Sequence, residues 1–145
     1  MKVQFYGAAQ RVTGSKHLVT TDNGTKILLD CGLFQGINTT DLNQQFGFDP
    51  RQVDYVILSH AHIDHTGLLP RLIRKGFSGK IYSTHATQSL CEVMLADSAG
   101  IQERDLKRVN KRRIKRGDEP IEVLYTQADV DKTLSLFETF DYHKE

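Results

Sequence analysis

The sequence predicts an α/β fold in which a mixed or antiparallel β-sheet is flanked by helices. A short apolar run at residues 53–58 is typical of a buried strand. A segment with helical apolar spacing follows at residues 66–75, and a second strand-like run comes at residues 80–83, so the order is strand, helix, strand. The 145 residues, of which 39% are hydrophobic, are enough to bury one core.

The beginning of the chain predicts an antiparallel meander. Residues 2–6, 16–21 and 25–30 are strand-like runs, and Asn23-Gly24 between the last two is a strong hairpin signal. Residues 36–50 are polar, which predicts a loop with a short helix.

A long helix is expected from Ala86 through a basic stretch until Gly117 and Pro120 end it. The side of this helix that packs is expected to hold Leu90, Val93, Met94 and Ile101.

The pattern Thr126-Gln127-Ala128-Asp129 predicts a capped final helix. Its apolar side is expected to include Val130, Leu134 and Phe137.

Cysteine usage and hydropathy indicate an intracellular protein. Cys31 and Cys91 lie far apart and outside any C-x-x-C spacing, so both are expected to be reduced and partly buried. No stretch approaches the length of a membrane span, and the first residues do not resemble a signal peptide. We therefore expect a cytoplasmic location and no membrane partner.

Three histidines and an aspartate follow the apolar run at residues 53–58: His60, His62, Asp64 and His65. In extended backbone, residues two apart point the same way about 6.5 Å apart, so His60 and His62 can converge on one metal ion. Asp64 and His65 follow where the chain is expected to turn, which suits a second ion. Imidazole and carboxylate donors favour zinc, with manganese or iron as substitutes. The alternative is a group of surface histidines without a ligand.

The run His60-Ala61-His62-Ile63-Asp64-His65 resembles the H-x-H-x-D-H signature of the metallo-β-lactamase superfamily, whose fold is an αββα sandwich with a dinuclear metal site at one edge. The surrounding sequence resembles the β-CASP branch of nucleic-acid-processing enzymes in that superfamily. The segments that carry this resemblance are residues 7–15, 28–36, 84–87 and 95–98.

The resemblance implies that residues 1–145 are the N-terminal half of the sandwich, a partial metallo-β-lactamase domain. Family members also have a third-motif histidine, a bridging aspartate, a second half of the sandwich and an inserted β-CASP domain, and no segment here matches these. His143, the last histidine, fits none of those motifs. We therefore expect this chain to be part of a larger enzyme and to be inactive alone.

For the intact protein the resemblance implies a phosphodiesterase that acts on RNA with two zinc ions, manganese being the alternative. His60 and His62 would hold one ion, and Asp64 and His65 the other, while Asp64 would also orient the attacking water. Asp30 would lie beside the metal site and order its ligands, although it can equally cap a turn. Two other functions stay open: hydrolysis of a thioester or lactone, and a non-catalytic binding module.

Positive charge is concentrated in residues 104–116, which contain eight lysines or arginines and one aspartate. The formal net charge of the whole chain is only +1. Such a run predicts contacts to RNA backbone phosphates rather than to bases, since no aromatic residue interrupts it. A solvated helix without a ligand is the alternative, and a homo-oligomer is also left open. The residues expected to contact phosphates are Lys107, Arg108, Lys111, Arg112, Arg113, Lys115 and Arg116.

Overall fold

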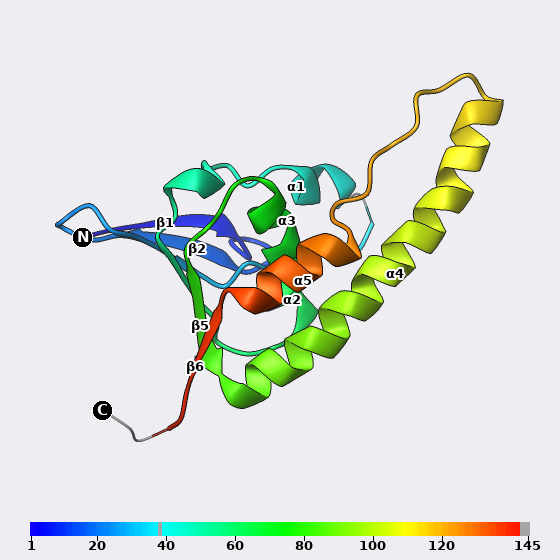
Figure 1. Ribbon diagram of the computed structural model, residues 1–145. Helices are drawn as coiled ribbons and strands as arrows, with labels where there is room; N and C mark the ends of the chain where they lie inside the picture. Colours follow the sequence, from blue (N-terminus) through cyan, green and yellow to red (C-terminus); the bar gives the residue numbers. More distant parts are fainter. Residues whose placement is uncertain (38, 143–145) are drawn as a thin grey trace.

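A six-stranded mixed sheet in the order β1-β2-β3-β4-β5-β6 forms the centre of the computed structural model, which describes residues 1–37 and 39–142 (Figure 1). The first three strands are antiparallel, and the pairs from β3 to β6 are parallel. His143 lies outside the described residues. The strands are β1 (Lys2–Gly7), β2 (Lys16–Thr20), β3 (Lys26–Leu29), β4 (Tyr55–Ile57), β5 (Lys80–Thr84) and β6 (Phe137–Phe140).

The helices lie on one face of this sheet, and the longest of them extends well beyond it (Figure 1). The α/β class, the antiparallel opening and the strand–helix–strand order are therefore confirmed. The helices are α1 (Thr40–Gln44), a 3₁₀ turn at Pro50–Gln52, α2 (Ile63–Thr66), α3 (Leu69–Arg74), α4 (His85–Lys115) and α5 (Gln127–Ser135).

The core lies between the sheet and the helices. Leu28, Val56 and Ile81 from adjacent strands are fully buried there, together with Leu72 of α3 and Leu95 of α4. Strand side chains alternate between the two faces, so the neighbours of these residues point to the opposite, uncovered side. That side carries exposed apolar residues: Val3, Phe5, Leu29, Tyr55, Ile57 and Phe140.

The side of helix α4 that packs against the core is not the side that carries most of its large hydrophobic residues. Leu90, Val93 and Ile101 are 55%, 69% and 44% exposed, so the prediction is wrong for these three residues. It is confirmed for Met94, which is half-buried and packs against the core. The side that packs is made of smaller residues four apart, which a search for large apolar side chains overlooks. It consists of Thr87, Cys91, Leu95 and Ala99.

The C-terminal region confirms the capped helix and adds one strand. The Thr126 and Asp129 side chains form the expected capping box, and Val130 is buried. Phe137 does not belong to the helix as predicted but begins β6, which pairs with β5. No glycine or proline separates Phe137 from α5, so the sequence has no signal that ends the helix before this residue.

Both cysteines are free, and they are fully buried where partial burial was expected. In the part of the chain that the structure describes, no helix combines the length and hydropathy required to cross a bilayer.

Leu95→Ala should lower the free energy of unfolding by about 2–5 kcal/mol, because it removes a fully buried side chain and leaves a cavity. Leu90→Ala on the same helix should change it by about 0.5 kcal/mol at most, because Leu90 is mainly exposed. Urea unfolding followed by circular dichroism measures both, and equal losses would contradict the observed orientation of α4.

Candidate metal centre

The four candidate ligands lie where β4 ends and α2 begins. His60 belongs to the short connection after β4, and His62 is the residue that precedes the first turn of α2. Asp64 and His65 are in α2 itself, so the turn expected at these residues is a short helix. The segment after β4 and the helix α2 together bring the three histidines and the aspartate close to one another.

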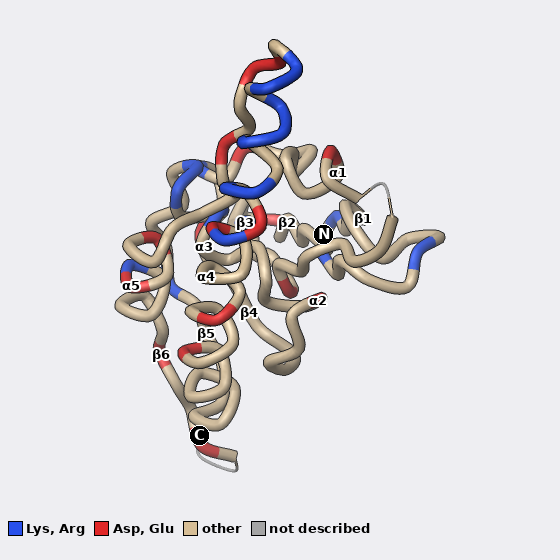
Figure 2. The backbone as a smooth tube through the Cα atoms, turned by 90° about the vertical axis from the view of Figure 1, so that its right-hand side faces the viewer, with Lys and Arg blue, Asp and Glu red and all other residues tan. Residues whose placement is uncertain are grey.

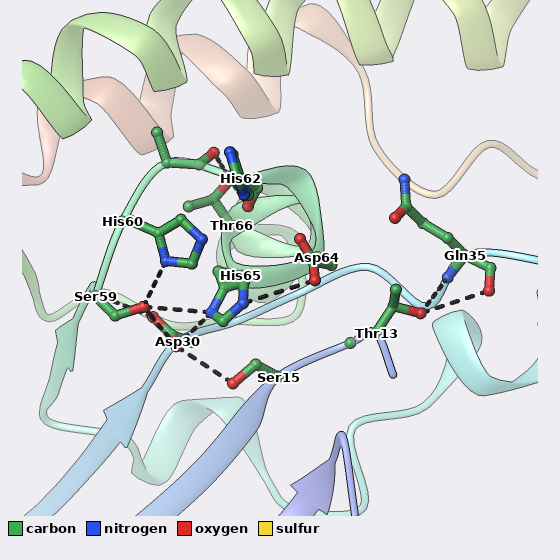
Figure 3. Close-up of polar contacts among 12 residues, drawn as sticks. Thr13, Ser15, Asp30, Gln35, Ser59, His60, His62, Asp64, His65 and Thr66 are labelled. Carbon is green, nitrogen blue, oxygen red and sulfur yellow. Dashed lines mark hydrogen bonds and ion pairs between the residues drawn. The ribbon is translucent and has the colours of Figure 1, made fainter. Parts of the chain in front are cut away.

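The four side chains gather at one surface (Figure 3). The ring centroids of His60 and His62 are 4.6 Å apart, and those of His60 and His65 are 4.0 Å apart. The Asp64 Oδ2 atom lies 3.6 Å from Nε2 of His65. His62 is exposed and the other three are half-buried, so a ligand can reach them.

Asp30 lies directly beneath this group and its side chain is saturated with hydrogen bonds. It is buried, with a left-handed φ of 58° that aspartate tolerates better than most residues. Its Oδ1 accepts from the Ser59 N–H at 2.8 Å, and its Oδ2 lies 2.8 Å from Nδ1 of His65. The hydroxyl of Ser15 also donates to it, at 3.3 Å.

These contacts assign the ring protons of two histidines. His65 donates from Nδ1 to the carboxylate of Asp30, so Nε2, which lies beside Asp64, is the ring nitrogen left for a ligand. The Ser59 hydroxyl donates to Asp30 at 2.9 Å and lies 3.0 Å from Nδ1 of His60, which can donate to it in turn. Both imidazoles therefore present Nε2, the arrangement in which a carboxylate orients a metal-binding histidine.

The backbone of α2 is fixed by two loops from elsewhere in the chain. The carbonyls of Ile63, Asp64 and His65 accept hydrogen bonds from the backbone N–H groups of Leu33, Ser15 and Cys31, at 3.1, 2.8 and 2.7 Å. The position of the candidate ligands thus depends on the loop before β2 and the loop after β3.

Gly32 allows these loops to approach. A Cβ added to it would lie 1.6 Å from the Asp64 carbonyl oxygen, so the backbones could not come together with any other residue. Sequence reasoning assigned no role to Ser15, Gly32 or Ser59. The glycine directly after Asp30-Cys31 was the available signal for a close backbone contact.

The donor set fits divalent metal ions in its chemistry. Three imidazoles and a carboxylate at one accessible surface are typical zinc ligands. Within residues 1–37 and 39–142, no group of three or more His, Cys, Asp or Glu side chains is already arranged to hold an ion. The four side chains therefore match a divalent metal ion in the type of donor atom, the orientation of the rings and their common location. They do not form a complete coordination shell.

The basic stretch forms the far half of α4, away from α2 in both views (Figures 1 and 2). Lys107, Lys111 and Lys115 are exposed and follow one another at intervals of four residues, so they lie on one side of the helix. Arg108 is also exposed and lies three residues before Lys111, beside this row. Arg113 differs, because it is half-buried and donates from Nε to the Glu119 carbonyl at 2.7 Å. Arg112 and Arg116 are also exposed.

A mixed sheet with helices on one face and an H-x-H-x-D-H group after a central strand defines the metallo-β-lactamase class of protein. Residues 13–136 match the family described as the metallo-beta-lactamase superfamily. The chain belongs to this superfamily, and membership implies the use of divalent metal.

Several characterised proteins are similar to this chain. Ribonuclease TTHA0252 of Thermus thermophilus is 47% identical over 103 residues, covering 71% of this chain and 24% of the relative. Cleavage and polyadenylation specificity factor 73 of Drosophila melanogaster is 29% identical over 147 residues, covering 100% of this chain and 19% of the relative. A solved metallo-beta-lactamase from Cronobacter sakazakii, a motif mutant, has a TM-score of 0.49 and 26% identity, covering 64% of this chain and 35% of that one.

The sequence relatives confirm the resemblance to the β-CASP branch. The chain spans about a quarter or less of the length of these two sequence relatives, 24% and 19%.

Asp30→Asn should weaken zinc binding about 10–100-fold, the usual cost of altering a residue that orients a metal ligand. Both carboxylate oxygens accept hydrogen bonds, so an amide would set its N–H₂ against a donor. Asp131→Asn on the exposed side of α5 is the matched control. Competitive titration against a chromophoric chelator measures the affinity, and equal values for the two variants would contradict a role for Asp30 in ordering the ligands.

Proposed function

We propose that the protein that contains this chain is a phosphodiesterase that cleaves RNA with two zinc ions, manganese being the alternative metal. The observation that carries this proposal is the group of three imidazoles and one carboxylate at an accessible surface, with two of the imidazoles oriented through Asp30. The ribonuclease among the relatives supports the same reaction.

In this proposal each residue of the group has a separate task. His60 and His62 would hold one cation, and Asp64 and His65 the second. Divalent cations bound there would lower the pKa of water and offset negative charge on the phosphoryl oxygens. The carboxylate of Asp64 lies beside the imidazole of His65 and can accept a hydrogen bond from the attacking water, which makes it the candidate catalytic residue. Asp30, in contact with His65 and Ser59, would keep the imidazoles oriented.

RNA is favoured over a thioester or lactone by two observations. Relatives carry the names ribonuclease and cleavage and polyadenylation specificity factor. The exposed basic side of α4 gives the protein a surface for phosphates, which a small-molecule hydrolase does not require. The basic half of α4 lies away from α2 in both views, which suits a polymer that contacts both places (Figures 1 and 2).

We also propose that residues 1–145 are a partial domain that supplies part of the metal ligands. Within residues 1–37 and 39–142, no side-chain group is arranged to hold an ion unaided, which supports this proposal. The chain alone should therefore bind zinc weakly and turn over no phosphodiester.

In the full-length protein, His62→Ala should reduce the bound zinc and lower RNA cleavage at least about a hundredfold, a loss of about 2.7 kcal/mol of transition-state stabilisation. His85→Ala is the matched control, because His85 is an exposed histidine outside the candidate site. Its Nε2 lies 3.4 Å from Oδ1 of Asp141. Metal analysis and cleavage of a labelled RNA measure both effects. Retention of zinc and cleavage by the purified His62→Ala protein would refute the assignment.

Changing Arg108, Lys111 and Lys115 together to alanine in the full-length protein should weaken RNA binding about equally across sequences, because these residues would contact backbone. The slope of log affinity against log salt should become shallower by about 2, at about 0.7 for each phosphate contact with single strands. Arg113 is left unchanged, since its contact to Glu119 makes it part of the local structure.

The control replaces three exposed lysines on other elements, Lys2, Lys75 and Lys132, and changes the net charge equally. Turnover of bis-p-nitrophenyl phosphate, which is too small to extend from α2 to the basic half of α4, should be unchanged in both triple variants. A salt slope that falls equally in the control would assign the effect to net charge and return the basic side of α4 to a solvated surface.

A further inference from the structure

Lys16 is a fully buried lysine at the start of β2. Its Nζ donates to the carbonyl of Gly32 at 2.8 Å and to the carbonyl of Gly14 at 3.2 Å. It also lies 4.1 Å from the centroid of the Phe34 ring, whose face attracts a cation. The ammonium group is therefore held by carbonyl oxygens and an aromatic face and not by a carboxylate. Burying a charge without an opposite charge beside it raises the free energy of the folded state.

The two carbonyls belong to the two loops that fix α2. Gly14 directly precedes Ser15, whose N–H donates to the Asp64 carbonyl at 2.8 Å. Gly32 lies between Cys31 and Leu33, whose N–H groups donate to the carbonyls of residues 65 and 63, at 2.7 and 3.1 Å. The acceptors of Lys16 are therefore the immediate neighbours of all three donors that hold the metal-ligand segment.

Other contacts support the same two loops from their edges. The Gly32 N–H donates to the Ser15 carbonyl at 2.9 Å, which joins the two loops directly. The Thr13 hydroxyl accepts from the Gln35 N–H at 3.0 Å, which joins them again at the exposed end (Figure 3). On the other side, the Asn43 side chain of α1 bonds both the N–H and the carbonyl of Phe34, at 2.8 and 2.9 Å. Lys16 occupies the buried centre of this arrangement, where no solvent can replace its hydrogen bonds.

We propose that Lys16 is a positioning residue for the metal centre. Its ammonium group joins the loop before β2 to the loop after β3, and these loops hold Asp64 and His65 through the backbone of α2. The inference rests on the proposed metal site but not on the identity of the substrate.

The protonation of Lys16 does not decide whether it can act in this way. Burial lowers the pKa of its amine to about 8. Burial raises the pKa of the Cys31 thiol to about 12, so Cys31 is neutral and does not pair with Lys16. A neutral amine still has two N–H donors for the two carbonyls.

The test is Lys16→Met in the full-length protein, which keeps the length of the side chain and removes its donors. We expect the Ser15, Cys31 and Leu33 amides to exchange with deuterium at least about tenfold faster, since local opening would become easier. Zinc affinity, measured by competition with a chromophoric chelator, should fall about 10–100-fold. Lys2→Met on the neighbouring strand β1, where the lysine is exposed, should change neither quantity.

A folded Lys16→Met protein with wild-type zinc affinity would overturn the proposal, even if its Tm were lower, because a purely structural role affects stability alone. If this variant does not fold, Lys16→Gln replaces it, since the shorter amide can reach only one of the two carbonyls. The Lys16→Gln protein should then bind zinc more weakly than the Lys2→Met control, by more than the error of the measurement. Unchanged zinc affinity in Lys16→Gln would equally overturn the proposal. Because neither measurement involves RNA, absence of cleavage by the wild-type protein would refute the proposed nuclease function without deciding the role of Lys16.

Discussion

Three backbone hydrogen bonds to consecutive carbonyls of α2 are the constraint on which the candidate metal centre depends. A four-residue helix cannot be stable by itself, because it is shorter than the length at which helices persist in water. Its placement must come from outside, and the N–H groups of Ser15, Cys31 and Leu33 supply it. Since these donors flank β2 and β3, the pairing of the two strands sets where the ligands lie.

A second constraint acts on the side chains and converges on Asp30. The left-handed backbone at this residue ends β3 and turns its carboxylate beneath the histidines instead of along the sheet. One buried carboxylate then orients His65 directly and His60 through Ser59. The centre thus separates two tasks: loop backbones fix where the ligand residues are, and Asp30 fixes which ring nitrogen they present.

The elements that could be predicted were those with a local signal. The Asn23-Gly24 hairpin, the capping box at Thr126 and the alternation of buried and exposed residues each depend on a few neighbouring residues. The packing side of α4 could not be predicted, because Cys91 and Ala99 are buried only through the position of the helix on the sheet. The same holds for β6, a four-residue strand defined by its pairing with β5.

The candidate site divides in the same manner. The spacing of His60, His62, Asp64 and His65 is a local pattern, and their proximity followed from it. The contacts of Ser15, Lys16 and Gly32 join segments far apart in sequence, and a lysine within a strand-like run has no feature that indicates burial.

The two halves of the proposed function, metal binding and RNA binding, make different demands on the fold. Metal ligands need fixed geometry, and the candidate ligands lie on a segment after β4 that other loops hold at three points. Phosphate contacts along a polymer need charge more than geometry, and the basic residues lie on the end of α4 that extends past the sheet (Figure 1). That end is stabilised locally instead: the Asn110 side chain bonds both the N–H and the carbonyl of Ile121, at 2.8 and 2.9 Å. The inward side of the helix is thereby tied to the returning chain, while Lys107, Lys111 and Lys115 stay exposed.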